Sequence, residues 1–228
     1  MTRQNRVMPD GTILAVPVRG TLTGNRGILH DATGQLGRAR WRHHHWIACA
    51  LSYKGIRRNV MSPGTWTELF FLDEAVALAA GHRPCALCRR SDYLAFRAAW
   101  GRAFGAVPSA DGIDRVLHAA RLCPGTRSHR PHEADAATLP EGTLIRQAEA
   151  TLLLLGSDAR PHAPGGYGPP LARPAGRVTV LTPLPLVAVL AAGYRPRLHA
   201  SAQMPGHPSP PQSASPQGNR LKVIGRFL

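Results

Sequence analysis

Two cysteines at metal-ligand spacing, Cys85 and Cys88, are the residues of this sequence best suited to chemistry. The two intervening residues bring both sulfurs to the inside of a tight turn, where two thiolates can hold one ion. A structural zinc site takes four nitrogen or sulfur ligands. The turn therefore predicts a zinc site whose other two ligands come from elsewhere in the chain.

Several residues are candidates for the missing ligands. Cys49, in an expected strand upstream, is the first choice, His30 the second and His82, three residues before Cys85, the third. Cys123 also stays a candidate, although its position in the sequence does not place it near the others. The alternative is that Cys85 and Cys88 are reduced thiols or a redox pair. A thioredoxin-like pair is disfavoured because no strand leads directly into the motif.

A family resemblance involves the residues before and within this turn. The segments Phe70–Ala75 and Ala79–Cys88 resemble the second half of the Ada-type zinc-binding domain, with a strand, a helix, an Arg-Pro turn and then Cys-x-x-Cys. Gly24–His30 is similar to the opening of shorter Ada-like modules attached to nucleases. The resemblance is strongest over residues 70–88 and extends loosely over 24–90.

The resemblance implies a zinc ion, either structural or methyl-accepting, in a module that binds DNA. The family's first cysteine pair has no counterpart here, because Cys49 is single. Methyl transfer in the family uses a zinc-bound cysteine of that first pair, so this activity is not implied. A structural zinc clamp and contact with DNA are the expectations that carry over.

The charge of the chain predicts a polyanionic partner. The formal net charge is +15, and residues 1–67 carry ten Lys and Arg against two acidic residues. Such a balance attracts nucleic acid, and we expect DNA rather than RNA. Guanidinium groups would contact phosphates and an indole would stack on a base; the candidate residues are Arg38, Arg40, Trp41, Arg42, Arg57 and Arg58. The alternative is a solvated basic surface with Trp41 packed on the sheet.

The histidines raise a second function, a metal-dependent nuclease or base-modifying hydrolase acting on nucleic acid. His43, His44 and His45 are adjacent, and His129 and His132 are three apart. Adjacent side chains on a strand point to opposite faces, so we expect at most His43 and His45 to share one. Only thirteen acidic residues are present, which weighs against a carboxylate-rich nuclease. A structural zinc module without nucleic acid is the third possibility.

The pattern of elements predicts an α+β fold. Asp73 and Ser91 are the expected N-caps of two helices, and one face of the second helix carries a core-type aromatic stripe. That stripe is Tyr93, Phe96, Trp100 and Phe104. Helices are expected over residues 75–80, 92–104, 114–122 and 184–192. Strands are expected within 5–30 and over 46–53, 56–61, 66–71, 143–148, 151–155 and 177–181. Residues 123–138 and 157–175 are expected to be irregular.

Three segments are expected along the chain. Residues 1–105 form a mixed sheet around a zinc knuckle, residues 110–200 a smaller α+β unit, and residues 201–228 a disordered basic tail rich in Pro and Ser. Four cysteines are too few for a disulfide scaffold of this length. The polar start, Met1–Asp10, and the absence of a long apolar stretch predict a cytoplasmic protein with no membrane association.

Overall fold

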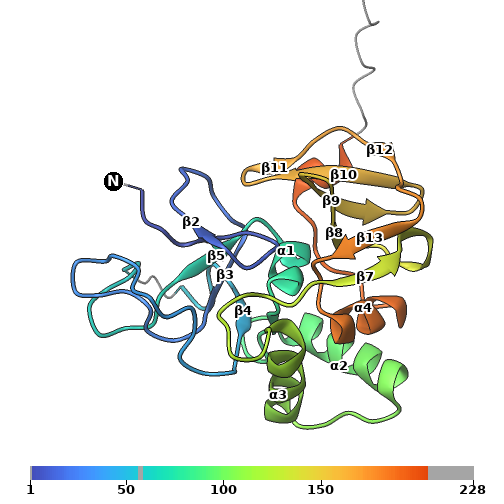
Figure 1. Ribbon diagram of the computed structural model, residues 1–228. Helices are drawn as coiled ribbons and strands as arrows, with labels where there is room; N and C mark the ends of the chain where they lie inside the picture. Colours follow the sequence, from blue (N-terminus) through green and yellow to red (C-terminus); the bar gives the residue numbers. More distant parts are fainter. Residues whose placement is uncertain (1, 56–58, 205–228) are drawn as a thin grey trace, which may run out of the picture.

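A computed structural model describes residues 2–55 and 59–204, and it has the α+β fold expected from the sequence. Two sheets lie side by side with one short helix between them, and three longer helices cover their lower edge (Figure 1). The last part of the expected tail and Ile56–Arg58 of the expected 56–61 strand lie outside the described residues.

The first sheet is mixed and is built from the N-terminal half. Its order is β2-β1-β5-β3-β4-β6, with parallel pairs β1–β5 and β4–β6 and antiparallel pairs elsewhere. The strands are short because Gly and Pro interrupt this region frequently. Their bounds are β1 Arg6–Val7, β2 Ile13–Leu14, β3 Leu22–Asn25, β4 Ile47–Ala50, β5 Leu69–Phe71 and β6 Arg83–Pro84.

The second sheet is built from the C-terminal half, and its strand pairs are antiparallel. Its order is β11-β10-β9-β8-β13-β7, with β12 also pairing with β10. The bounds are β7 His132–Asp135, β8 Leu144–Gln147, β9 Ala150–Leu155, β10 Asp158–Ala163, β11 Gly166–Tyr167, β12 Leu171–Ala172 and β13 Arg177–Val180.

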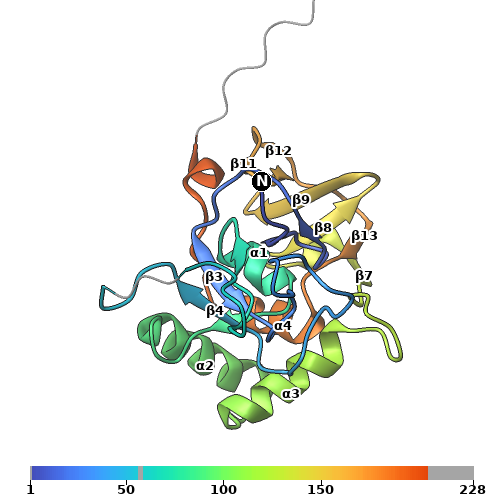
Figure 2. The ribbon, with the colours of Figure 1, turned by 90° about the vertical axis from the view of Figure 1, so that its left-hand side faces the viewer.

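Helix α1, Glu74–Ala79, lies between the two sheets (Figures 1 and 2). Asp73 caps it as predicted, because its Oδ1 accepts the Val76 N–H at 3.0 Å. All six helical residues are buried, and the small alanine side chains allow a close approach to strands on both sides. Gly81 ends the turn after the helix at φ +80°, where a Cβ atom would lie 2.4 Å from Arg121 Cδ.

Two buried carboxylates at the start of α1 accept hydrogen bonds from the C-terminal half of the chain. Asp73 accepts a hydrogen bond from the Tyr167 hydroxyl at 3.1 Å, and Glu74 accepts one from the Tyr194 hydroxyl at 2.6 Å. Burial is the largest factor that raises the pKa of each tyrosine, and the neighbouring carboxylates add to it. These bonds join residues on both sides of position 105. The division into separate units at 105–110 stays a prediction.

The other α-helices form a layer around the aromatic stripe. Tyr93, Phe96 and Trp100 are buried as expected, whereas Phe104 is exposed. Phe96 packs edge-on against Tyr194, with ring centroids 5.5 Å apart. The bounds are α2 Arg90–Phe104, α3 Ala110–Arg121 and α4 Leu184–Ala191, and two short 3₁₀ helices span Ala136–Thr138 and Ala200–Gln203.

Several local predictions were wrong. The 157–175 segment is not irregular: β10, β11 and β12 form there. The 123–138 segment contains β7 and a 3₁₀ turn. α2 begins at Arg90 rather than after Ser91, because the buried Arg89 guanidinium binds Glu74 and Asp92 and fixes the N-terminus. α3 begins at Ala110, where the Ser109 hydroxyl accepts the Gly112 N–H.

Within the described ranges, none of the helices has the length and apolar character needed to cross a bilayer.

Candidate metal centre and basic pocket

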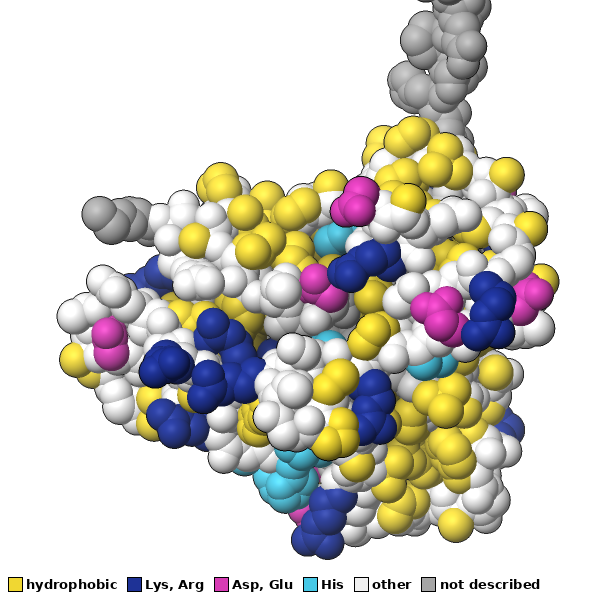
Figure 3. Space-filling view, viewed as in Figure 1, with side chains coloured by type: hydrophobic (Ala, Val, Ile, Leu, Met, Phe, Trp, Pro, Cys, Tyr) yellow, Lys and Arg dark blue, Asp and Glu magenta, His cyan; other side chains and the backbone are white. Residues whose placement is uncertain are grey.

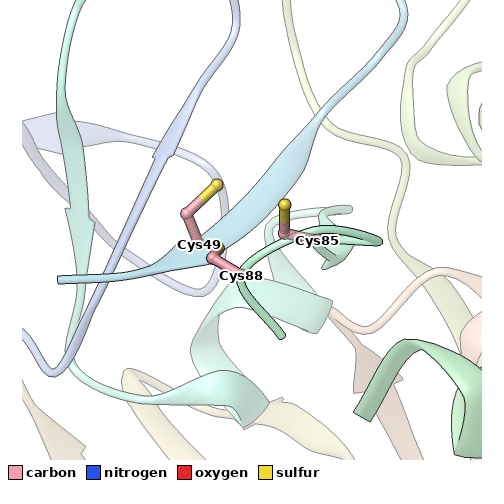
Figure 4. Close-up of side chains that lie close together, drawn as sticks. All are labelled: Cys49, Cys85 and Cys88. Carbon is pink, nitrogen blue, oxygen red and sulfur yellow. The ribbon is translucent and has the colours of Figure 1, made fainter. Parts of the chain in front are cut away.

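Backbone pairing between β4 and β6 brings the three cysteines together. The two strands run parallel with Ala48 opposite Pro84, and the Cys85 N–H donates to the Ala48 carbonyl at 3.0 Å. Cys49 therefore lies on the strand directly beside the Cys-x-x-Cys turn (Figure 4). The turn itself connects β6 to the start of α2, so Cys49 lies on a strand and the other two thiols lie in a short turn fixed at both ends by regular elements.

The three sulfurs of Cys49, Cys85 and Cys88 lie within 4.8 Å of one another. Two backbone N–H groups also point at them: that of Leu87 donates to Cys85 Sγ at 3.4 Å, and that of Ala50 donates to Cys88 Sγ at 3.3 Å. Such N–H···S contacts stabilise thiolates, which are the metal-binding form of cysteine. The cluster can therefore hold a metal ion. The prediction that Cys49 joins Cys85 and Cys88 agrees with this placement.

The pKa shifts of the three thiols explain why a bound cation would be favourable in this cluster. A hydrogen bond from the Cys49 thiol lowers the pKa of Cys85 to about 4, and the same contact raises that of Cys49. Burial raises the pKa of Cys88. Without a metal ion, the Cys85 thiolate is favoured, whereas Cys49 and Cys88 are held as neutral thiols. A bound cation removes this conflict by favouring all three thiolates together.

The other predicted metal ligands lie elsewhere. His30 is buried, with Nδ1 2.7 Å from the Thr67 hydroxyl and Nε2 3.2 Å from the Ser62 carbonyl. His82 is fully buried beside Arg26, and Cys123 Sγ donates to the His129 carbonyl. Across residues 2–55 and 59–204, no fourth His, Cys, Asp or Glu joins the three-cysteine group.

A pocket of about 380 Å³ opens beside the cysteines. Its wall includes three aromatic residues, Tyr53, Trp66 and Phe70, and one buried carboxylate, Glu68. Glu68 Oε2 accepts the Met61 N–H at 2.6 Å. A metal ion held by the cysteines would thus border a largely apolar cavity of the size that small-molecule sites have.

Four of the six predicted nucleic-acid residues lie close together. Arg38, Arg40, Trp41 and Arg42 line one shallow depression, which Arg127 completes from the loop after α3. Arg38 and Arg42 are exposed, and Trp41 is half-buried against Trp46, with ring centroids 6.1 Å apart. Figure 3 shows Lys and Arg side chains gathered over the loops around β3 and β4. The remaining two predicted residues, Arg57 and Arg58, lie outside the described part of the chain.

A second, deeper pocket adjoins this basic surface, and two of its inner residues, Arg26 and Trp46, were not predicted as site residues. It has a volume of about 450 Å³, and Arg26, Trp46 and His129 form part of its wall. These residues come from separate loops, so no local motif marks them. The pairing of a buried arginine with a tryptophan is visible only once the chain is folded.

Two of the three adjacent histidines share one carboxylate. His44 Nε2 lies 2.7 Å from Asp111 Oδ1, and His45 Nε2 lies 3.7 Å from the same oxygen. His45 Nδ1 is also 3.0 Å from Asp114 Oδ2. The expectation that at most His43 and His45 would share a face was wrong, because residues 42–44 form a bend and the three histidines precede β4 rather than lying on a strand. His44, His45 and Asp111 are a second, partly exposed group that could hold a metal ion.

Comparison of the chain with protein-family models, with curated proteins and with solved structures finds no match.

Proposed function

We propose that this chain is a zinc-stabilised protein that binds nucleic acid, with DNA as the favoured partner. The three-cysteine cluster supports a zinc ion, since thiolate ligands select soft or borderline metals and zinc is the commonest in such turns. The ion would fix the Cys-x-x-Cys turn between β6 and α2. The Ada-type resemblance over residues 70–88 supports the same metal and the same class of partner.

The observation that carries the nucleic-acid part is the basic surface around Trp41. Four guanidinium groups, those of Arg38, Arg40, Arg42 and Arg127, surround one half-buried indole. Of the ion pairs formed within the described ranges, none involves these four arginines. Their charge is thus available to phosphates, and the indole offers a face for a base.

The test is the salt dependence of binding to labelled single-stranded and duplex DNA, with RNA of the same sequence in parallel. Arg38→Gln and Arg42→Gln should each weaken binding and reduce the slope of log K against log salt by about 0.9 on duplex DNA. Arg177→Gln, an exposed arginine on β13, is the matched control and should change neither. Equal effects from all three variants would contradict the proposal.

Stacking on Trp41 is tested separately. Trp41→Ala should cost about 1–3 kcal/mol of binding to single strands, because one base–aromatic contact is lost. Absence of binding to any polyanion at moderate salt would leave a structural zinc module as the function of the chain.

A hydrolase acting on nucleic acid is the second candidate, and the pocket beside the cysteines favours it. Catalytic zinc sites commonly have three protein ligands and one open position, and the cluster offers three. Zinc bound there would supply a Lewis acid at the edge of the cavity. Glu68 lines that cavity and is the carboxylate available to hold or move a proton. Metal-dependent turnover of nucleic acid, lost in Glu68→Gln with zinc content unchanged, would establish this candidate.

A further inference from the structure

The deep pocket beside the basic surface contains buried cationic groups that form no ion pair with any described residue. Arg26 is 1% exposed, and its guanidinium stacks on the Trp46 ring with Cζ 3.9 Å from the ring centroid. Its Nε is 3.4 Å from His82 Nε2, and its Nη1 donates weakly to the Gly11 carbonyl at 3.5 Å. Its Nη2 is buried, and no residue in the described ranges 2–55 and 59–204 forms a hydrogen bond with it. A buried guanidinium left in this way is costly.

A second buried guanidinium adds to the positive charge. Arg121 stacks on the same ring, with Cζ 3.6 Å from the Trp46 centroid. It donates to the carbonyls of Gly81 and His44, each at 2.8 Å, and its Nη2 is 2.7 Å from His118 Nδ1. Among the residues that the structure describes, none forms a hydrogen bond with its Nε. Carbonyl oxygens satisfy hydrogen bonds but do not neutralise the charge. Two cations therefore lie beside one indole in the protein interior.

The wall and rim of the pocket continue this pattern. Both ring nitrogens of His129 are buried and form no hydrogen bond within the described part of the chain. Four further arginines line the pocket, namely Arg38, Arg40, Arg127 and Arg146. One carboxylate, Asp10, also lies in the wall. It accepts hydrogen bonds from Thr12 and from Arg146 Nη2 at 3.2 Å, so its charge is balanced by Arg146.

The pKa values of these groups are lowered, as expected for buried cationic groups that repel one another. Burial, with a contribution from Arg40, lowers the pKa of Arg26 to about 9. Burial also lowers the pKa of Arg121, and repulsion from Arg26 adds to it. The pKa of His129 falls to about 3 because of burial and the same two arginines. An anion in the pocket would oppose these shifts by raising the pKa of each group.

We propose that this pocket binds a phosphate group, held by Arg26 from within and by the arginines of the rim. A phosphate offers several acceptor oxygens and up to two negative charges. It can therefore accept hydrogen bonds from more than one guanidinium group and balance more positive charge than a carboxylate can. The pocket, at about 450 Å³, leaves room beside Trp46 and Trp41 for an aromatic group attached to the phosphate. The phosphate of a nucleotide, or that at the end of a nucleic-acid strand, has this chemistry.

The first experiment uses inorganic phosphate as the probe in isothermal titration calorimetry and thermal unfolding of the full chain. Phosphate should bind with a stoichiometry of one and raise the melting temperature. Arg26→Gln should weaken binding by about tenfold or more, the usual effect of losing a hydrogen bond to a charged group. Arg177→Gln should bind as the unmodified chain does. Absence of phosphate binding by the unmodified chain would overturn the proposal and leave Arg26 as a structural partner of Trp46.

A rim variant keeps the proposal testable if Arg26→Gln does not fold. Arg40 is only partly buried and binds backbone carbonyls of its own loop. Arg40→Gln should therefore fold and should still weaken phosphate binding several-fold. Unchanged affinity in a folded Arg40→Gln variant would contradict the assignment of the rim.

The source of the phosphate is distinguished by competition. Adenosine monophosphate should bind more tightly than inorganic phosphate, while adenosine without phosphate should not bind. A single strand with a 5′-phosphate should bind more tightly than the same strand without it, and free phosphate should remove the difference. Binding of free phosphate and binding of nucleic acid are measured separately. Absence of phosphate binding would overturn the pocket proposal but not nucleic-acid binding by the basic surface. Absence of nucleic-acid binding would overturn the proposed function but not the pocket proposal.

Discussion

Removal of the Asp114 carboxylate is expected to destabilise the whole protein, because it leaves a buried cation without its partner next to the Cys-x-x-Cys turn. Arg83 lies in β6, immediately before Pro84 and Cys85. Its Nε and Nη2 donate to the two oxygens of Asp114 on α3, each at 2.8 Å. The side chains are 4% and 1% exposed, so water cannot replace either partner.

The magnitude follows from this burial. Breaking a buried ion pair by removing one partner costs about 3–5 kcal/mol, since the remaining charge stays desolvated. That is a large part of the roughly 5–15 kcal/mol that stabilises a typical domain. For a chain of this size the melting temperature should fall by about 6–20 °C. We therefore expect Asp114→Ala to unfold at much lower urea concentration than the unmodified chain.

The assay is equilibrium urea denaturation of three variants followed by circular dichroism. Asp111→Ala on the same helix is the control, because Asp111 is partly exposed and its partners His44 and Arg115 remain in contact with water. It should cause a much smaller loss. The double variant Arg83→Met/Asp114→Leu should be more stable than Asp114→Ala, because no charge is left buried. A loss below about 1 kcal/mol in Asp114→Ala, or a double variant no more stable than Asp114→Ala, would refute the reasoning.

Three further predictions concern the turn before the cysteines, the buried histidine and the division of the chain. Gly81→Ala should cost more stability in urea denaturation than Gly105→Ala, because both glycines have positive φ but only at Gly81 would a Cβ meet Arg121; equal losses would contradict this. His129 has a folded-state pKa of about 3, below the usual value near 6.5. Only the unfolded chain therefore binds its proton between these values, and stability present above pH 6.5 should fall by up to about 2 kcal/mol at pH 5. His129→Gln should reduce this pH dependence, and an unchanged dependence would contradict it. The segment 1–105 expressed alone should lack cooperative thermal unfolding, because the buried carboxylates of α1 lose their tyrosine partners; a sharp transition would show the opposite.

Local patterns were sufficient to predict which cysteines lie together. Cys85 and Cys88 have the spacing of metal ligands, and Cys49 lies in a strand that the apolar pattern identifies. The structure places its sulfur beside theirs. His30 could not be rejected from the sequence, because only the folded chain shows that Thr67 and Ser62 occupy both of its ring nitrogens.

Errors in the predicted elements arose where tertiary contacts outweigh local preference. The 157–175 segment is rich in Gly and Pro and has no clear alternation, yet β10 forms because β9 offers it a paired edge. The start of α2 depends on a buried ion pair between Arg89 and Glu74, which a search for capping side chains does not detect.

The phosphate pocket depends on long-range assembly in a similar way. Arg26, Trp46, His82, Arg121 and His129 are spread over a hundred residues and become neighbours only through the fold. A sequence-based reading identifies the basic character of the region around residues 38–42. It has no means of recognising which guanidinium lies buried without a counter-ion.

The central claim, that Cys49, Cys85 and Cys88 hold one zinc ion, is tested most directly by the metal content of four serine variants. Mass spectrometry and elemental analysis of the zinc-reconstituted full chain should give one zinc per chain. That zinc should be lost in Cys49→Ser, Cys85→Ser and Cys88→Ser, and kept in Cys123→Ser, whose sulfur lies outside the cluster. A chain that folds fully without binding zinc, or one in which Cys123→Ser loses zinc as the other variants do, would contradict the account.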